Sequence, residues 1–491
     1  MINVDIAIVG NGILALSTAF ELTGRDGSLS VAVIGPDSQA GAATPASGAM
    51  LNCFAEVTKY TLHSDASRAK FEMCRDALSL WPDWLDLVCD VSGHDRPHNV
   101  SGTVVIENTV SGDLDSENFD AMLEAAAKYG ENHELISPRG ITGLDPTPSS
   151  RPLRALYFPE EGAVDSGALY EAVRAALVAR GVQFVPQAVS ALSRDGDRAT
   201  GATLANGERV RANVVLVAAG AFTTPLLDTV LAPDDVQPVF SGTGISTVTR
   251  RTEAEQFCHV VRTVNRAGSC GLHAVPFPQG RDYVGATNVV FATPRTRPSA
   301  GLSHFLLQCA IDQLNNDFAF AEIDEWRVGN RPVSLDTFPL LGPGPLDQLH
   351  IATGTYRDGF HNSPLIARIM ADGILGAEPY VHPFLPHRRP ISVFTAAESA
   401  AETAYQGACT GFEASLVLPR LWRHQAVPAL FSSGAAHMYE DLGSPHGLSP
   451  DIVPFLVAGA FSENGPDRAA YLRVKALLGN RGATSELETT R

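Results

Sequence analysis

The sequence lacks the features that mark exported, membrane-spanning or zinc-bound proteins. No apolar run is long enough to cross a bilayer, and the longest, Ile452 to Phe461, is interrupted by Pro454. The seven cysteines include no Cys-x-x-Cys pair, which argues against a zinc site and a disulfide framework. No basic patch with a signal-like apolar stretch precedes the first apolar segment. We therefore expect a reduced, cytoplasmic protein with no metal and no membrane contact.

Positive charge is also scarce. The chain has 36 Lys and Arg against 54 Asp and Glu, a net charge of −18, which argues against binding to nucleic acid or anionic membranes. Hydrophobic residues make up 45% and charged residues 18%, a balance typical of a globular protein with a large core. A chain of 491 residues has room for two or three domains.

The most informative segment is the N-terminal one. An apolar run from Val4 to Val9 ends in Gly10-Asn11-Gly12-Ile13-Leu14-Ala15, and a second apolar run follows from Leu29 to Ile34. This order predicts a strand, a tight turn, a helix and a second strand. The glycines let the backbone approach a pyrophosphate, and the helix start offers free N–H groups and positive dipole. The segment therefore predicts dinucleotide binding.

Two details depart from the usual dinucleotide-binding pattern. Ala15 stands at the third glycine position, where helix and strand must pack closely. Gly35-Pro36 stands where an acidic residue normally binds the ribose hydroxyls. Asp37, one position further on, either reaches the ribose or is a plain turn residue.

Later segments predict further contacts with a flat ligand and a second sheet. The small-residue loop from Gly41 to Met50 lets a ligand lie close to the backbone. A buried strand from Arg211 ends in Ala218-Ala219-Gly220, where a cofactor is approached again. The region from Val239 to about Val290 alternates apolar and polar residues, which favours antiparallel strands. Helical patterns recur at 395–405 and 468–478.

Together these segments resemble the D-amino-acid-oxidase-like flavoprotein superfamily, with glycine oxidase and sarcosine oxidase among its members. The N-terminal glycines, the Gly162-Ala163-Val164-Asp165 helix entry and the strand end at Gly220 carry part of the resemblance. The most specific part is Trp326 to Pro332, with Asp336, Pro339 and Gly342 behind it, and then 353–364. This block is similar to the family pattern Gly-x-Arg-Pro … Asp-x-x-Pro-x-x-Gly. The resemblance covers about residues 3–392.

The resemblance implies an α/β fold with three parts. These are a Rossmann-like FAD-binding domain assembled from 1–50, 150–237 and 325–380, a second α+β substrate domain from 51–149 and 238–324, and a mostly helical C-terminal extension, 381–491. The extension lies beyond the family core. Either it packs on its own chain or it docks a partner, and self-association into a homo-oligomer stays open.

The resemblance also implies FAD rather than NAD. The stretches where some relatives attach flavin covalently, Gly329 to Asp336 and Thr44 to Leu51, contain no cysteine or histidine, so we expect non-covalent FAD. The implied contacts run from the pyrophosphate through the flavin loop and the ADP half to the isoalloxazine. They are Gly10, Gly12, Ile13, Leu14 and Asp37; Thr44, Ser47, Ala49 and Met50; Val189, Ala219 and Gly220; and Gly354, Arg357, Asp358, Gly359, Phe360 and His361.

For the substrate, the resemblance implies that Arg331 pairs with a carboxylate, since a guanidinium is planar, always charged and bidentate. His273, Asn288 and Arg357 are the other predicted pocket residues. The implied reaction is oxidation of an amino acid or related amine. Hydride passes from Cα to flavin N5, the imine hydrolyses, and O2 reoxidises the flavin to give H2O2.

Two other functions remain open at this point. The same fold oxidises hydroxy acids or alcohols in other members of the superfamily, and such a reaction needs a general base, for which His273 is a candidate. The C-terminal extension is also consistent with a flavoprotein subunit of a larger complex. A panel of amine and alcohol substrates separates the two enzymatic functions.

Overall fold

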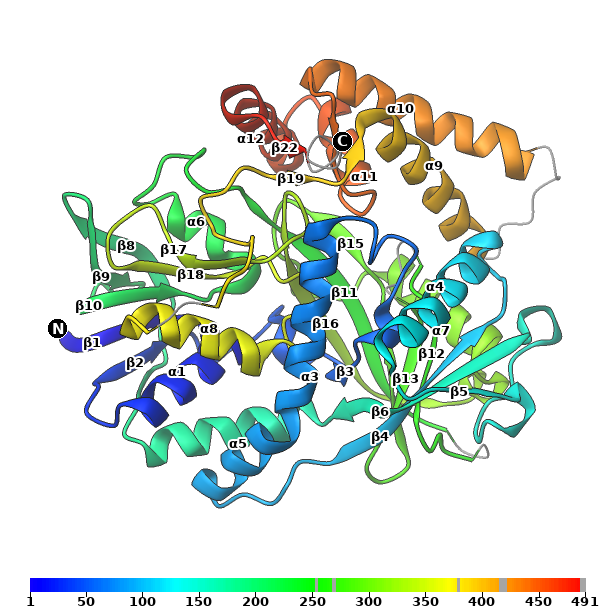
Figure 1. Ribbon diagram of the computed structural model, residues 1–491, viewed down its shortest axis with the longest axis horizontal. Coiled ribbons are helices and arrows are strands. Elements are labelled where there is room, and N and C mark those ends of the chain that lie inside the picture. The colour runs from blue at the N-terminus through cyan, green and yellow to red at the C-terminus, as the bar shows by residue number, and fades with distance from the viewer. Residues whose placement is uncertain (252–254, 267–270, 378–379, 415–421, 486–491) are drawn as a thin grey trace.

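The computed structural model describes residues 1–251, 255–266, 271–377, 380–414 and 422–485. Figure 1 shows two sheets side by side, with the C-terminal helices along one edge. Within these ranges, none of the helices combines the length and the apolar composition that crossing a membrane requires.

The first sheet contains the predicted dinucleotide-binding unit. Its strands run in the order β17, β18, β10, β1, β2 and β7, and β8 joins through β9, which pairs with β10. From β18 to β7 the neighbours are parallel. The bounds are β1 (Ile2–Val9), β2 (Val31–Ile34), β7 (Gln183–Val185), β8 (Val189–Asp195), β9 (Arg198–Leu204), β10 (Arg209–Val217), β17 (Leu340–Pro343) and β18 (Leu349–Thr353).

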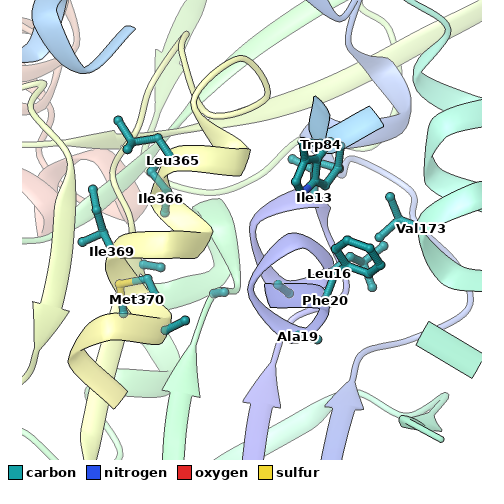
Figure 2. Close-up of a cluster of buried hydrophobic side chains, with 14 of the residues drawn as sticks. Ile13, Leu16, Ala19, Phe20, Trp84, Val173, Leu365, Ile366, Ile369 and Met370 are labelled. Atoms are coloured by element: carbon teal, nitrogen blue, oxygen red, sulfur yellow. The ribbon is translucent and has the colours of Figure 1, made fainter. Parts of the chain in front are cut away.

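Strand β1 is buried on both faces, which explains its continuous apolar sequence. Ile6 and Ile8 belong to a core cluster with the helices on one face, whereas Val9 belongs to a cluster on the other. Figure 2 shows part of the first cluster, with Phe20 near Trp84 and Val173. The helices that contribute to it are α1 (Ile13–Arg25), α3 (Asp65–Ser92), α5 (Ser166–Ala179) and α8 (Ser363–Leu375).

The second sheet runs in the order β15, β11, β14, β13, β12, β4, β6 and β3, with β16 paired to β11 and β5 to β6. The antiparallel strands predicted between Val239 and Val290 are confirmed. The bounds are β3 (Met50–Leu51), β4 (Asn99–Glu107), β5 (Glu134–Ile136), β6 (Arg154–Val164), β11 (Val239–Arg250), β12 (Val260–Thr263), β13 (His273–Phe277), β14 (Arg281–Gly285), β15 (Val289–Phe291) and β16 (Glu322–Ser334). Helices α4 (Asp113–Tyr129) and α7 (Ala300–Gln313) pack against this sheet.

The predicted domain boundaries place 150–237 and 325–380 in the FAD-binding domain, and most of β6 and β16 falls in these ranges. The sheet to which the two strands belong is a different one. Both pair within the second sheet, β6 with β4 and β16 with β11 along nearly its whole length. Each strand leads out of the second sheet toward the first, so the chain changes layer at its end. The residues at these strand ends therefore lie between the two sheets.

The C-terminal extension packs on the body of its own chain. Its buried side chains form one cluster with five body residues: Phe240, Val290, Val333, Leu335 and Tyr356. Arg473 also pairs with Asp228 of the body at 2.6 Å. The bounds are β19 (Ile391–Ser392), β20 (Phe394–Thr395), α9 (Ala396–Glu413), α10 (Val427–Leu442), β21 (His446–Gly447), α11 (Val453–Phe461), α12 (Gly465–Arg481) and β22 (Thr484–Ser485).

Candidate active site

A cavity of about 970 Å³ lies between the two sheets and is lined by residues from both. Most of the predicted cofactor residues line it: Gly10, Gly12, Ile13, Leu14, Thr44, Ser47, Ala49, Met50, Val189, Ala219, Gly220, Arg357, Asp358, Gly359, Phe360 and His361. Arg331 and His273 line it as well. Asp37 is exposed and lies outside the lining, because the chain turns outward after β2. Gly354 and Asn288 are buried beside the cavity without lining it.

The turn after β1 has the geometry of a pyrophosphate-binding turn. Gly10 has φ +125°, and a Cβ there would lie 2.2 Å from the carbonyl oxygen of Ala218, so no other residue fits without movement. Gly12 caps α1 with no side-chain hydrogen bond, which leaves the helix N-terminus directed at the cavity. These features fit the diphosphate of a dinucleotide.

The small-residue loop is fastened to this turn. The backbone N–H of Ile13 donates to the hydroxyl of Thr44 at 3.0 Å, and that of Ala49 donates to the hydroxyl of Ser47 at 2.8 Å. Gly48 lies against an aromatic pair, since a Cβ there would lie 2.7 Å from the Tyr283 ring. The loop therefore forms part of the cavity wall, where its small side chains let a planar ligand approach the backbone.

Helix α3 contacts the segment 357–361, which follows β18. The Trp81 indole donates to the carbonyl of His361 at 2.7 Å, and the rings of Trp81 and Phe360 stack at 6.0 Å with 4° between their planes. The His361 ring contacts α3 as well, because its Nε2 lies 2.7 Å from the carbonyl oxygen of Cys74. Burial lowers the pKa of His361, so its ring stays neutral. These contacts hold Phe360 and His361, the end of the segment 357–361, against α3.

Arg331 is the charged residue of this cavity that has no opposite charge beside it. Its Nη1 donates to the carbonyl of Thr287 at 3.1 Å and to Asn288 Oδ1 at 3.4 Å. No carboxylate among the described residues lies within salt-bridge distance of it, and its Nη2 and Nε make no hydrogen bond to them. Gly244 makes room for the group, since a Cβ there would lie 2.3 Å from Nη1. A half-buried, uncompensated guanidinium attracts an anionic ligand.

The other charged residues that line the cavity are each paired. Arg357 pairs with Asp451 at 3.3 Å, and Asp358 with Lys70 at 2.9 Å. The partners of the remaining two complete the set: Glu56 pairs with Arg262, and Arg473 with Asp228. Arg331 is therefore the positive charge available for a ligand among the described residues.

His273 presents a hydrogen-bond acceptor to the cavity. Its Nδ1 lies 2.9 Å from the carbonyl of Gly271, which only accepts, so Nδ1 carries the hydrogen and Nε2 has a free lone pair. A Cβ at Gly48 would lie 3.3 Å from Nε2, so this atom lies beside the small-residue loop. Burial and the charge of Arg262 lower the pKa of His273 to about 3. The ring is neutral at ordinary pH.

This histidine makes stability depend on pH. The unfolded histidine takes up a proton near its ordinary pKa of 6.5, whereas the folded one stays neutral until about 3, so acid favours unfolding. We expect the unfolding free energy of the wild type, relative to His273→Gln, to fall by about 1.4 kcal/mol per pH unit below 6.5. Urea unfolding between pH 7 and pH 5 measures this difference. The surface variant His94→Gln is the control, and parallel profiles for wild type and His273→Gln would contradict the assignment.

Asn288 and Tyr356 connect the two predicted arginines. Asn288 Nδ2 donates to the hydroxyl of Tyr356, whose ring lies 5.0 Å from the Arg357 guanidinium. Asn288 Oδ1 accepts from Arg331. Asn288 therefore does not line the cavity. It orients the Arg331 guanidinium through this hydrogen bond.

Several lining residues were not among the sequence predictions. Glu56, Tyr283 and Tyr356 line the cavity from the body. Residues of α12 also line it, and these are Pro466, Ala469, Ala470 and Arg473. Tyr356 stands inside the Thr353–Pro364 motif, so it was open to prediction. The contribution of α12 has no signal in the local sequence.

Comparison with known proteins decides the family. The model of a family described as "DAO: FAD dependent oxidoreductase" matches residues 5–373. The chain belongs to this family. The family is FAD-dependent, and the features at Gly10 and Gly12 fit that cofactor. The protein is therefore an FAD-dependent oxidoreductase, as the sequence predicted.

Individual relatives are distant. The chain is 26% identical over 393 residues to a bifunctional protein ThiO/ThiG of Synechocystis, and it spans only 54% of that protein while 78% of this chain is covered. It is 25% identical to a glycine oxidase of Pseudomonas putida, over 77% of this chain and 96% of that one. The crystal structure of glycine oxidase from Geobacillus kaustophilus superposes with a TM-score of 0.67 at 24% identity, covering 79% of this chain and 99% of that one. This last likeness confirms the fold.

Proposed function

We propose that the protein oxidises the C–N bond of an amino acid whose carboxylate binds Arg331. The observation that carries this proposal is the uncompensated guanidinium in the cavity. A carboxylate matches its planar fork and supplies the missing negative charge. The names of the relatives support the same class, since they include glycine oxidases and D-amino acid dehydrogenases.

His273 favours an amine over a hydroxyl as the reacting group. Its Nε2 lone pair accepts a hydrogen bond from the substrate amine and so orients the lone pair of that nitrogen. Burial and the charge of Arg262 lower the pKa of His273, which makes its ring a weak base for the proton of an alcohol. An amine needs no such base once it is neutral, because its own lone pair assists departure of hydride from Cα.

The remaining residues orient and enclose the reactants. FAD, when bound, supplies the hydride acceptor, and we propose that O2 reoxidises it. The turn at Gly10 and Gly12 would hold the diphosphate, the loop from Thr44 to Met50 would face the flavin, and 357–361 would supply backbone N–H groups to its polar edge. Val189, Ala219 and Gly220, which line the same cavity, would face the ADP half. The imine product and water then give a carbonyl compound and ammonia or an amine.

The test is anaerobic titration of the purified protein reconstituted with FAD. The panel contains amino acids of both enantiomeric series, the amines that lack their carboxylate, and the matching 2-hydroxy acids. We expect amino acids to bleach the visible flavin absorption and hydroxy acids to leave it unchanged. Bleaching by hydroxy acids alone would overturn the proposal. Denaturation with acid, followed by filtration, tests whether the flavin is released and is therefore non-covalent.

A further inference from the structure

A second cavity of about 240 Å³ adjoins the first. The two cavities share four lining residues: Glu56, Tyr356, Arg357 and Asp358. This second cavity, here called the side chamber, therefore borders the main cavity at these residues, and one of them, Tyr356, accepts a hydrogen bond from Asn288, the partner of Arg331. Its volume equals that of about eight water molecules, enough for a side chain of several non-hydrogen atoms.

The C-terminal extension builds one wall of the side chamber. Val393 and Phe394 line it before α9, Gln406 lines it from α9, and Ser449 and Asp451 line it before α11. The opposite wall comes from the body, including Asn118 of α4 and Lys70 of α3. The side chamber consequently belongs to this chain's own architecture, since the part matched by the family model ends at residue 373.

Every charged residue that lines the side chamber is paired. Four of them form two ion pairs within the lining, one between Lys70 and Asp358 at 2.9 Å and one between Arg357 and Asp451 at 3.3 Å. The other four pair with residues that do not line the chamber. These pairs are Lys59 with Glu117, Glu56 with Arg262, Arg266 with Asp115, and Asp336 with Arg388. A charged ligand group would lose its hydration here without gaining an unpaired opposite charge.

Uncharged hydrogen-bonding groups are available instead. Gln406 Nε2 donates to Glu402 at 2.9 Å, and its amide oxygen makes no hydrogen bond to any described residue. The hydroxyl of Ser449 also lines the chamber and accepts only a long contact, 3.4 Å, from the backbone of Asp451. These groups match an amide or a hydroxyl at the end of a ligand.

We propose that the side chamber binds the end of the substrate side chain, and that this end is an uncharged hydrogen-bonding group such as an amide. The proposal rests on the proposed function, because it takes the carboxylate at Arg331 as the substrate's other anchor. It names the substrate class: a polar, uncharged amino acid of about the length of glutamine. The substrate carboxylate is assigned to the main cavity because Arg331 is uncompensated there. The uncharged end of the substrate is assigned to the side chamber because the charged residues there are paired.

The test uses carboxylates that have no amine and so cannot be oxidised at a C–N bond. Glutaramate, hexanoate and glutarate have similar lengths and end in an amide, a methyl and a carboxylate. Their affinities for the FAD-loaded protein are measured by calorimetry, with acetate as the short reference. We expect glutaramate to bind about tenfold more tightly than hexanoate or glutarate. Equal or tighter binding of either competitor overturns the proposal.

Two variants locate the effect. Gln406→Leu keeps the volume and removes the amide, so the preference for glutaramate over hexanoate is expected to vanish. Ser449→Leu fills the chamber and is expected to weaken glutaramate about tenfold while leaving acetate unchanged, which also shows that the protein is folded. Gln308→Leu is the control, because Gln308 makes the same i, i+4 bond, to Asp312, on α7. Unchanged selectivity in both chamber variants overturns the proposal.

This result is separable from the fate of the proposed function. If no amino acid reduces the flavin, the reaction is wrong, yet the binding preference of the three carboxylates still tests the side chamber. If amino acids do reduce the flavin but the analogues show no preference for an amide, the reaction stands and the side chamber has another role.

Discussion

Replacing Arg331 with methionine is expected to raise KM for α-amino acids about 100-fold and to leave KM for the matching amines within about twofold. The reason is that a charge-assisted, bidentate contact to a carboxylate contributes roughly 3 kcal/mol, and each 1.4 kcal/mol is a factor of ten. An amine without a carboxylate never made this contact. Steady-state kinetics with matched acid and amine pairs measures the effect.

Two further variants make this prediction sharper. Arg331→Lys keeps the charge and loses the fork, so an intermediate KM is expected. Arg327→Met is the control, because Arg327 lies on the same strand, pairs with Glu325 and does not line the cavity. An equal rise in KM for acids and amines in Arg331→Met would assign Arg331 to the architecture of the cavity rather than to carboxylate binding.

The parts of the site that were predicted from the sequence depend on local backbone chemistry. Gly10 needs φ +125°, and Asp165 caps α5 by accepting from the backbone N–H groups of Gly167 and Ala168. Such requirements leave short motifs at fixed spacing. The turn, the helix that starts at Ser166 and the strand that ends before Ala219 were therefore predictable.

The parts that were not predicted depend on contacts between distant segments. Glu56 lies between the main cavity and the side chamber because Arg262, 206 residues later, holds its carboxylate. Its own surroundings in the sequence show only an acidic residue after an apolar stretch. The same applies to α12, which is held beside the cavity by a buried cluster that its side chains share with body residues, and by the pair of Arg473 with Asp228.

The predicted domain boundaries differ from the observed sheets at the points where the chain passes from the second sheet to the first. The sequence of β16 carries the Gly-x-Arg-Pro pattern, which predicts proximity to the cofactor and favours assignment to the FAD-binding domain. Proximity and sheet membership are different properties here, since β16 pairs with β11 and only its end reaches the interface between the sheets. Arg331 uses this arrangement, because it lies opposite Gly242 in the pairing and its guanidinium reaches past Gly244.

The largest effect on the cofactor is expected from Gly10→Ala. The new Cβ would lie 2.2 Å from the carbonyl oxygen of Ala218, and alanine at φ +125° is strained in addition. Relief requires β1 and β10 to separate at their ends, where the turn would hold the diphosphate. We expect FAD affinity to fall more than about 100-fold, since displaced N–H groups of the turn each forfeit roughly 1.5–3 kcal/mol toward a charged group.

Titration of the apoprotein with FAD, followed by quenching of flavin fluorescence, measures this loss. Gly27→Ala is the matched control, because Gly27 follows α1 in the same unit and a Cβ there meets nothing within 4 Å. Thermal unfolding of both apoproteins separates a local effect from general destabilisation. If Gly10→Ala bound FAD as tightly as the wild type, the diphosphate would have to lie elsewhere in the cavity. The roles proposed for the loop from Thr44 to Met50 and for 357–361 would then lose their common reference point, because both are placed by a cofactor that begins at this turn.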